Sequence, residues 1–129
     1  MIIGIGSDII DIRRIEKLSA KFGTRFEKRV FSAGELVAGK KYSNAKKFHS
    51  FLAKRFAAKE AVAKALGTGI GKDISFKEAE VSNLPSGKPT ISLNGRALDK
   101  LKSLNDGAKI DISLSDDYPY AQAFVIISS

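Results

Sequence analysis

The segment from Ala45 to Leu66 constrains the fold of this chain more than any other. Glycines at positions 67, 69 and 71 follow it directly, and three glycines in five residues oppose continuation of a helix. The segment therefore predicts a long helix that ends at Leu66. Placed at about 100° per residue, its alanines and large apolar side chains cover most of the circumference. A helix that is apolar nearly all round is expected to be buried.

Charged residues interrupt this apolar pattern. Arg55 and Lys59 fall within an apolar arc of the helix, and Glu60 lies at its margin. Charges are costly in such a place unless they are paired or bound to an ion. One interpretation is an internal ion pair, since Glu60 and Lys64 have i,i+4 spacing. The other is a cleft in which Glu60 and its cationic neighbours hold a metal and an anion. The pattern alone supports both equally.

Asp8 is a second candidate site residue. The sequence around Ile2, Ile3 and Ile5 predicts a short strand that ends near Asp8, where a carboxylate can project into a cleft. For a lone aspartate, an exposed strand-end position that starts the next helix is the simpler interpretation. Asp8 and Glu60 together would supply two hard oxygen ligands, which suit magnesium when phosphates and waters complete its shell.

The remaining pattern predicts an α+β fold with a small antiparallel sheet packed against the long helix, in one domain spanning residues 1–129. A capping box at Ser32 and Glu35 predicts the start of a helix that ends near Gly39. The other expected elements are helices over 12–21 and 96–104, strands over 76–84 and 89–93, and a terminal hairpin of strands over 109–114 and 120–127.

Composition excludes several classes of site. The chain has no cysteine and one histidine, so disulfides, thiolate metal sites and multi-histidine metal sites are excluded. It has no apolar run of about 18–20 residues to span a membrane and no signal-peptide pattern, so we expect a cytoplasmic protein. Residues 13–64 hold 15 Lys or Arg against 4 Asp or Glu. This field attracts nucleic acid, membrane surfaces, phosphate-rich cofactors or acidic proteins.

The glycine-rich segment from Gly67 to Gly71 is not a dinucleotide fingerprint, because it follows a helix instead of a strand. It is a helix stop, and its flexible backbone beside Lys64 is also able to hold a phosphate through its N–H groups.

Several motifs along the whole chain resemble one family. They are Gly4-Ile5-Gly6-Ser7-Asp8-Ile9, Arg14-Ile15, Phe31-Ser32 with Glu35, Phe51-Leu52-Ala53-Lys54-Arg55-Phe56-Ala57-Ala58-Lys59-Glu60-Ala61, Lys64-Ala65, Gly67-Thr68-Gly69-Ile70-Gly71, Gly87-Lys88-Pro89, and Ser113-Leu114-Ser115-Asp116 with Tyr118 and Ala121. On these motifs the chain resembles the holo-acyl-carrier-protein synthases, the short class of phosphopantetheinyl transferases. The central segment and the glycine loop are highly specific together.

The resemblance implies a role for individual residues. Asp8 and Glu60 are implied as magnesium ligands, and Lys64 as a catalytic cation. The implied coenzyme A site comprises Arg55, Lys64, Gly67, Thr68, Pro89 and Asp116, with Lys46 and Lys47 near the ribose phosphate. Arg14, Arg25 and Lys28 match the basic region that receives the acidic acyl carrier protein. A homotrimer with its sites between subunits is also implied.

The implied reaction moves 4'-phosphopantetheine from coenzyme A to a carrier-protein serine and releases adenosine 3',5'-bisphosphate, as a step of fatty acid and lipid biosynthesis. Many family members have histidine where this chain has Asp116, so an imidazole base is absent there. Asp116 can order a metal-bound water, contact the coenzyme or do neither. The competing functions are a basic nucleic-acid-binding domain, which lacks any recognised binding motif here, and a carrier-protein adaptor without catalysis.

Overall fold

The computed structural model describes all residues from 1 to 129. In chain order its elements are β1 (Ile2–Asp11), α1 (Ile12–Phe22), α2 (Thr24–Val30), α3 (Ala33–Gly39), α4 (Ala45–Leu66), the 3-10 turn η1 (Phe76–Glu78), β2 (Ala79–Asn83), β3 (Pro89–Leu93), α5 (Gly95–Leu104), β4 (Lys109–Asp117) and β5 (Tyr120–Ser128). The predicted α+β class with antiparallel pairing is confirmed.

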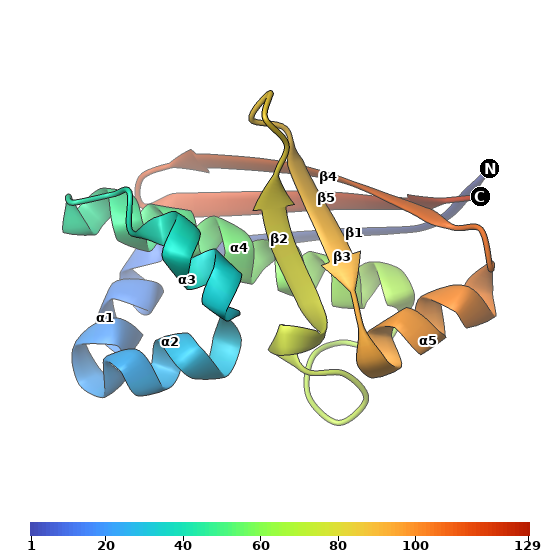
Figure 1. The fold of residues 1–129 in the computed structure, drawn as a ribbon, viewed down its shortest axis with the longest axis horizontal. Coiled ribbons are helices and arrows are strands. Elements are labelled where there is room, and N and C mark those ends of the chain that lie inside the picture. The colour runs from blue at the N-terminus through green and yellow to red at the C-terminus, as the bar shows by residue number, and fades with distance from the viewer.

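The strands form two sheets. One has the order β1-β5-β4, and the other is the β2–β3 hairpin; every pairing is antiparallel. Figure 1 shows α4 running along the three long strands, with the β2–β3 hairpin crossing in front of them. The terminal strands of the chain are neighbours in the sheet, so both termini lie at the same end of the molecule (Figure 1).

The helix α4 is the centre of the core, as its apolar pattern predicts. It has the predicted bounds, with Asn44 as N-cap and Gly67 in the left-handed conformation as C-cap. Alanines along its length, including Ala53, Ala57 and Ala61, are fully buried. Small side chains let neighbouring elements approach the helix axis closely, so α4 contacts β1, β5, α1, α3, α5 and β2.

Two glycines bring β1 directly onto α4. A Cβ added at Gly4 would meet the carbonyl oxygen of Ala65, and one at Gly6 would meet the carbonyl oxygen of Ala61. Because side chains alternate along a strand, Asp8 lies on the same face of β1 as these glycines. The strand therefore presents Asp8 to α4.

The structure differs from the sequence prediction at several boundaries. The first strand does not end near Asp8: it continues to Asp11, because β5 pairs with it as far as the Asp11–Tyr120 pair. Residues 76–78 form a 3-10 turn instead of strand, since Glu78 accepts from the Ser75 amide. The last two strands extend to Asp117 and Ser128 through mutual pairing.

One element was not anticipated. The helix α2, with Phe26 and Val30 buried, has no side-chain N-cap, and Gly23 separates it from α1. None of the helices is both long enough and apolar enough to cross a membrane.

Candidate functional site

Asp8 and Lys64 form the first part of the site. The Lys64 Nζ donates to Asp8 Oδ1 at 3.1 Å and to the carbonyl oxygen of Ser7 at 2.9 Å. The Asp8 side chain is only 18% exposed, whereas that of Lys64 is 53% exposed. Asp8 is therefore a mid-strand residue that faces the last two turns of α4, and it is not an exposed strand end.

Glu60 lies beside this pair. Burial raises the pKa of Glu60 and the nearby Asp8 charge raises it further, while Lys64 and Arg14 oppose the shift. The Glu60 carboxylate takes part in none of the ion pairs of the structure, so the i,i+4 pair with Lys64 does not form. The partly buried carboxylates of Asp8 and Glu60 thus lie near each other, and Lys64 is the cation paired with Asp8.

These two carboxylates fit a hard divalent cation. The chain has no cluster of three or more His, Cys, Asp or Glu side chains suited to a metal ion. A cation held by Asp8 and Glu60 would keep most of its coordination positions for non-protein oxygens. This is typical of magnesium sites that also take substrate phosphates. The mutual repulsion that raises the Glu60 pKa is relieved by such an ion.

The glycine loop ends α4 next to Lys64. The Gly67 amide donates to the Lys64 carbonyl at 3.0 Å, and the Thr68 and Gly69 amides donate to the Ala63 carbonyl at 3.0 and 3.3 Å. These N–H groups close the helix C-terminus, so they are not free to hold a phosphate. The helix stop therefore accounts for the glycines, and a phosphate site at this loop stays a prediction.

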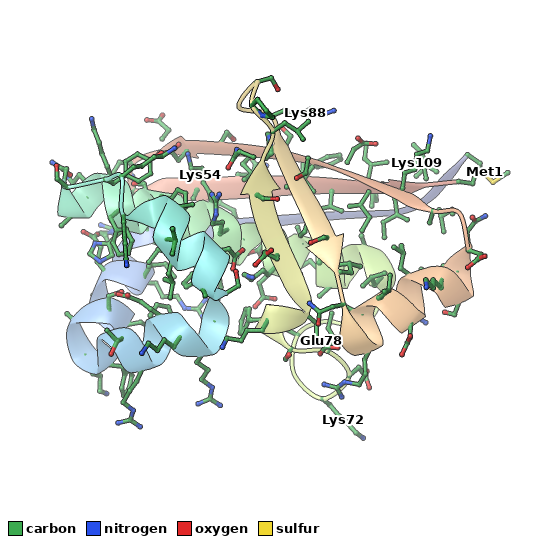
Figure 2. The ribbon with its side chains drawn as sticks, in the orientation of Figure 1. Met1, Lys54, Lys72, Glu78, Lys88 and Lys109 are labelled. Carbon is green, nitrogen blue, oxygen red and sulfur yellow. The ribbon has the colours of Figure 1, made fainter.

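A pocket of about 480 Å³ lies between α4 and the β2–β3 hairpin. Figure 2 shows Lys54 on α4 and Lys88 at the tip of the hairpin. The lining includes the predicted Arg55 and Pro89, and also residues that sequence reasoning missed: Lys41, Tyr42, Lys54 and Asn83. Lys54 directly precedes Arg55 in the recognised motif, but nothing in the sequence indicates that Asn83 meets Arg55.

Arg55 is a buried cation in the wall of this pocket. Its guanidinium lies 3.8 Å from the centroid of the Phe51 ring and donates to Asn83 Oδ1 at 2.9 Å. Its Nε has no hydrogen-bond partner. Burial lowers the pKa of Arg55, an effect that Glu35 opposes. A buried guanidinium with an unpaired N–H and no carboxylate within an ion-pair distance is suited to an anion in the pocket.

Lys59 has a different environment from Arg55. It is fully buried and forms an ion pair of 2.9 Å with Glu35, whose side chain is also fully buried. The structural interpretation of the charges on α4 is thus right for Lys59, but its partner comes from α3 instead of α4. The capping box at Ser32 identifies Glu35 as a cap, which conceals its second role as a partner for Lys59.

A second pocket, of about 270 Å³, adjoins the first through Tyr42, Phe51 and Lys54. Its lining includes Lys46, Lys47 and Asp116, and Asp116 Oδ1 lies 3.1 Å from Lys54 Nζ. Asp8 lies on β1 and Asp116 on β4, the two outer strands of the three-stranded sheet. The β4 residue level with Asp8 is Leu114, two positions before Asp116. Strand spacing and rise place the Cα atoms of Asp8 and Asp116 roughly 12 Å apart.

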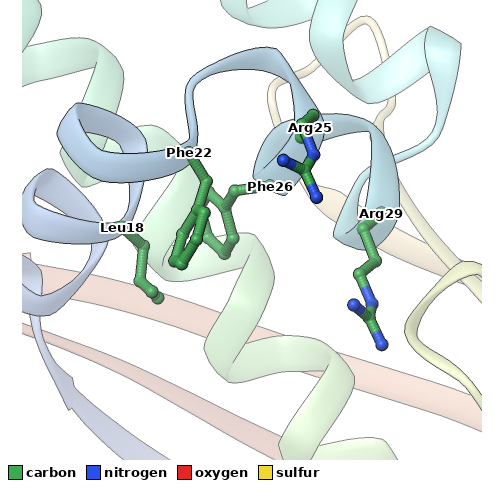
Figure 3. A pocket seen from close by; sticks show the side chains of 5 residues that line it. All are labelled: Leu18, Phe22, Arg25, Phe26 and Arg29. Carbon is green, nitrogen blue, oxygen red and sulfur yellow. The ribbon is translucent and has the colours of Figure 1, made fainter.

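The residues expected to receive a partner lie on another face. Figure 3 shows a pocket of about 320 Å³ between α1 and α2, lined by Leu18, Phe22, Arg25, Phe26 and Arg29. Of the predicted residues, Arg25 lines this pocket, and Lys28 is exposed on α2 but does not line it. Arg29 was missed.

Arg14 on α1 is near both the α1–α2 pocket and the Glu60 carboxylate. Its guanidinium lies 5.4 Å from the centroid of the Phe56 ring, and its charge acts on Glu60. Basic residues of the 13–64 region therefore line several separate pockets, and Arg14 is the cation of α1 whose charge acts on Glu60.

Comparison with known proteins gives a consistent result. Residues 4–123 match the profile of the 4'-phosphopantetheinyl transferase superfamily. A holo-[acyl-carrier-protein] synthase of Bradyrhizobium diazoefficiens is 52% identical, with 100% of this chain and 96% of that protein covered. One of Bartonella quintana is 51% identical, with 100% and 97% covered.

Solved structures of the same kind superpose on this fold. The holo-[acyl-carrier-protein] synthase of Neisseria meningitidis has a TM-score of 0.84 at 37% identity, covering 100% of both chains. That of Helicobacter pylori in complex with coenzyme A has a TM-score of 0.81 at 37% identity, covering 96% of this chain and 99% of that one.

Proposed function

This chain belongs to the 4'-phosphopantetheinyl transferase superfamily, and on that premise we propose that it converts apo acyl carrier protein to the holo form. It transfers 4'-phosphopantetheine from coenzyme A to a carrier-protein serine and releases adenosine 3',5'-bisphosphate. Residues 1–129 act as one domain. The observation that carries the proposal is the meeting of Asp8, Glu60 and Lys64: two partly buried carboxylates with a lysine nitrogen 3.1 Å from one of them.

Asp8 and Glu60 are proposed as the ligands of a magnesium ion. When bound, the ion neutralises charge on the diphosphate of coenzyme A. Lys64 is already within 3.1 Å of Asp8, so it is placed to stabilise the charge that shifts to the leaving phosphate. The serine hydroxyl attacks the pantetheine-side phosphorus, the bond to the bisphosphate breaks, and the hydroxyl proton passes to Glu60 or to a water beside it. Positioning dominates such a transfer.

The two joined pockets are proposed to take the nucleotide part of coenzyme A. Arg55, Lys54 and Lys41 supply cations in one pocket, and Lys46 and Lys47 supply them in the other. Pro89 and Tyr42 add apolar surface for the base. Gly67 and Thr68 follow Lys64 at the end of α4, where the Thr68 hydroxyl donates to the Ala63 carbonyl at 3.3 Å, and they line neither of these two pockets.

Asp116 is proposed to orient Lys54 at the nucleotide end. The ion pair of 3.1 Å and the location in the second pocket support this role. Within one subunit, strand geometry separates its Cα from that of Asp8 by roughly 12 Å, so the ion pair with Lys54 is the role that this geometry supports. On this proposal residue 116 contributes to coenzyme binding. Having aspartate there instead of histidine therefore removes no catalytic base.

The pocket between α1 and α2 is proposed to receive the acyl carrier protein. Arg25 and Arg29 flank an apolar floor of Leu18, Phe22 and Phe26 (Figure 3). Exposed cations around an apolar centre suit an acidic helix that inserts one or two apolar side chains. Arg14 lines an adjoining pocket that shares Leu18 with this one, and its charge acts on Glu60, so we expect a partner docked here to present its serine near the metal ligands.

A trimer is proposed to form through the outer face of the three-stranded sheet. Ile5, Ile9 and Phe124 all point away from α4 and are 61%, 65% and 42% exposed. Large apolar side chains gathered on one sheet face mark an association surface. A small subunit with shallow pockets gains closed sites from such an assembly. The cytoplasm, where coenzyme A is available, is the proposed compartment.

The nucleic-acid alternative gains no separate support. The basic residues of 13–64 line discrete pockets on α1, α2 and α4, whereas the exposed aromatic side chains of the sheet, Tyr120 and Phe124, lie on β5 outside those pockets, so no aromatic platform accompanies the cations. Stacking of bases requires such platforms.

The test is direct. Incubating the protein with apo carrier protein, coenzyme A and magnesium should add the mass of one phosphopantetheine to the carrier, and an unchanged mass refutes the proposal. Glu60→Gln should abolish the transfer while leaving the melting temperature equal or higher, because it removes the charge that burial and Asp8 disfavour. Asp99→Asn, on the exposed side of α5, is the matched control and should be fully active.

A further inference from the structure

The buried pair of Glu35 and Lys59 makes a complete set of hydrogen bonds. The Lys59 Nζ donates to Glu35 Oε1 at 2.9 Å, to the carbonyl of Phe76 at 3.1 Å and to the carbonyl of Ala79. These three acceptors use all three donors of an ammonium group. The Glu35 carboxylate also accepts from the Ser32 amide at 2.9 Å and from the Val81 amide at 2.9 Å.

The pair therefore joins three elements that are distant in sequence. Glu35 belongs to α3, Lys59 to α4, and three of their partners belong to the segment Phe76–Val81, which contains η1 and the start of β2. The β2–β3 hairpin has no hydrogen bonds to the three-stranded sheet. An isolated two-stranded hairpin is marginally stable, so its position depends on contacts of this kind.

The tip of the same hairpin is held by a second link to α4. Arg55 lies one helical turn before Lys59 and donates to Asn83 Oδ1 at 2.9 Å, and Asn83 Nδ2 donates to the Gly87 carbonyl at 3.0 Å. Arg55, Asn83 and Gly87 all line the pocket proposed for coenzyme A. Lys59 does not line it and is fully buried.

We infer that Glu35 and Lys59 are positioning residues for coenzyme A: they fix the base of the hairpin on α4, and thereby set how Arg55 and Asn83 face the pocket. This inference rests on the proposed function. A salt bridge alone is weak support for stability, because burying both charges offsets much of their attraction. The role that the contacts support for this pair is the orientation of β2. The pair acts on coenzyme binding without touching the coenzyme.

The expected signature separates positioning from mere folding. The double variant Glu35→Gln/Lys59→Met removes both charges at similar volume, and its one amide oxygen replaces only one of the two carboxylate oxygens that accept from the Ser32 and Val81 amides. We expect its KM for coenzyme A to rise about 10-fold while kcat changes less than about 3-fold and the KM for carrier protein stays constant. Exchange of the Val81 amide hydrogen should be faster in the variant.

Two further variants test whether the effect on coenzyme binding arises from the hairpin or from a general loss of stability. Leu101→Ala in α5, a buried residue remote from the pocket, should lower the melting temperature without changing the KM for coenzyme A. Asn83→Ala should raise that KM, and its effect should not multiply with that of the double variant if both act through the hairpin. If the double variant fails to fold, Glu35→Gln alone, which keeps an acceptor, should still raise the KM.

The outcomes distinguish this inference from the proposed function. Calorimetric titration of the parent with coenzyme A comes first. A parent that binds no coenzyme A refutes the proposed function and this inference with it. A parent that binds, with folded variants of unchanged affinity or with effects that multiply with Asn83→Ala, overturns the inference alone.

Discussion

Replacing Gly6 by alanine is expected to damage both stability and activity, because this glycine sets the distance between β1 and α4. A Cβ at residue 6 would lie 2.8 Å from the Ala65 nitrogen, 3.1 Å from the Ala61 carbonyl carbon, and closer still to the Ala61 oxygen. All three are backbone atoms of a buried helix. No side chain is able to rotate away and relieve the contact.

The magnitude follows from the geometry. Carbon atoms in contact prefer about 3.5–4.0 Å, so β1 has to move away from α4 by roughly 1 Å. Overpacking of this kind costs about 1–3 kcal/mol. For a chain of this length a loss of about 2 kcal/mol lowers the melting temperature by roughly 6–10 °C. Asp8 follows Gly6 by two residues on the same strand face, and a displacement of about 1 Å at a reacting centre lowers kcat/KM about 100-fold.

The assay combines a thermal melt with the kinetics of carrier-protein modification. Gly34→Ala is the matched control, since the nearest atom to its added Cβ is the flexible Glu80 side chain at 3.4 Å. Gly34 lies within α3, where alanine is favoured over glycine by about 0.5–1 kcal/mol. The control should melt at or above the parent temperature and keep full activity. A Gly6→Ala protein as stable and as active as the parent would refute the proposed role of the close β1–α4 contact.

Three further predictions follow from other parts of the structure. Ile9→Lys should convert the trimer to monomers, as measured by light scattering. The control Val37→Lys also replaces an exposed apolar side chain, but on α3, and should leave the trimer intact. A trimeric Ile9→Lys protein refutes the proposed interface. Arg29→Glu should raise the KM for carrier protein at least 10-fold with little change in the KM for coenzyme A, and equal effects on both would contradict the assigned docking surface. Although burial raises the pKa of Glu78, hydrogen bonds from the Ser75, Ala97 and Arg96 amides lower it below its usual 4.5. Its stabilising contribution is therefore complete above about pH 4.5 and is lost as the pH falls through the folded-state pKa, so acid melts of Glu78→Gln should show a smaller pH dependence than the parent.

Glu78 also illustrates a limit of reading capping residues from sequence. Asn94 has the residue type of an N-cap for α5, but its side chain makes no capping bond. Glu78 instead accepts from the Arg96 amide at 2.6 Å and from the Ala97 amide at 3.2 Å, and as the last residue of η1 it lies near the start of α5 (Figure 2). A cap supplied from outside the helix leaves no local sequence pattern.

The elements best predicted were those with strong local signals. The end of α4 followed from the Gly67 stop, and the start of α3 followed from the capping box at Ser32. The helix α2 was missed because it is short and its N-cap is Gly23, without a side-chain bond. The lengths of β1, β4 and β5 were underestimated because pairing with a neighbour, and not local preference, decides where a strand ends.

The segment from Arg55 to Glu60 shows the same division within the site. The sequence by itself determined that charges lie on a buried helix, because residue type and helical period are local properties. Only the tertiary structure decided which partner each charge has: Arg55 meets Asn83, Lys59 meets Glu35, and Glu60 meets Asp8. Those partners come from strands and helices that the fold brings together over long sequence separations. Pairing across such separations depends on packing, which no local pattern encodes.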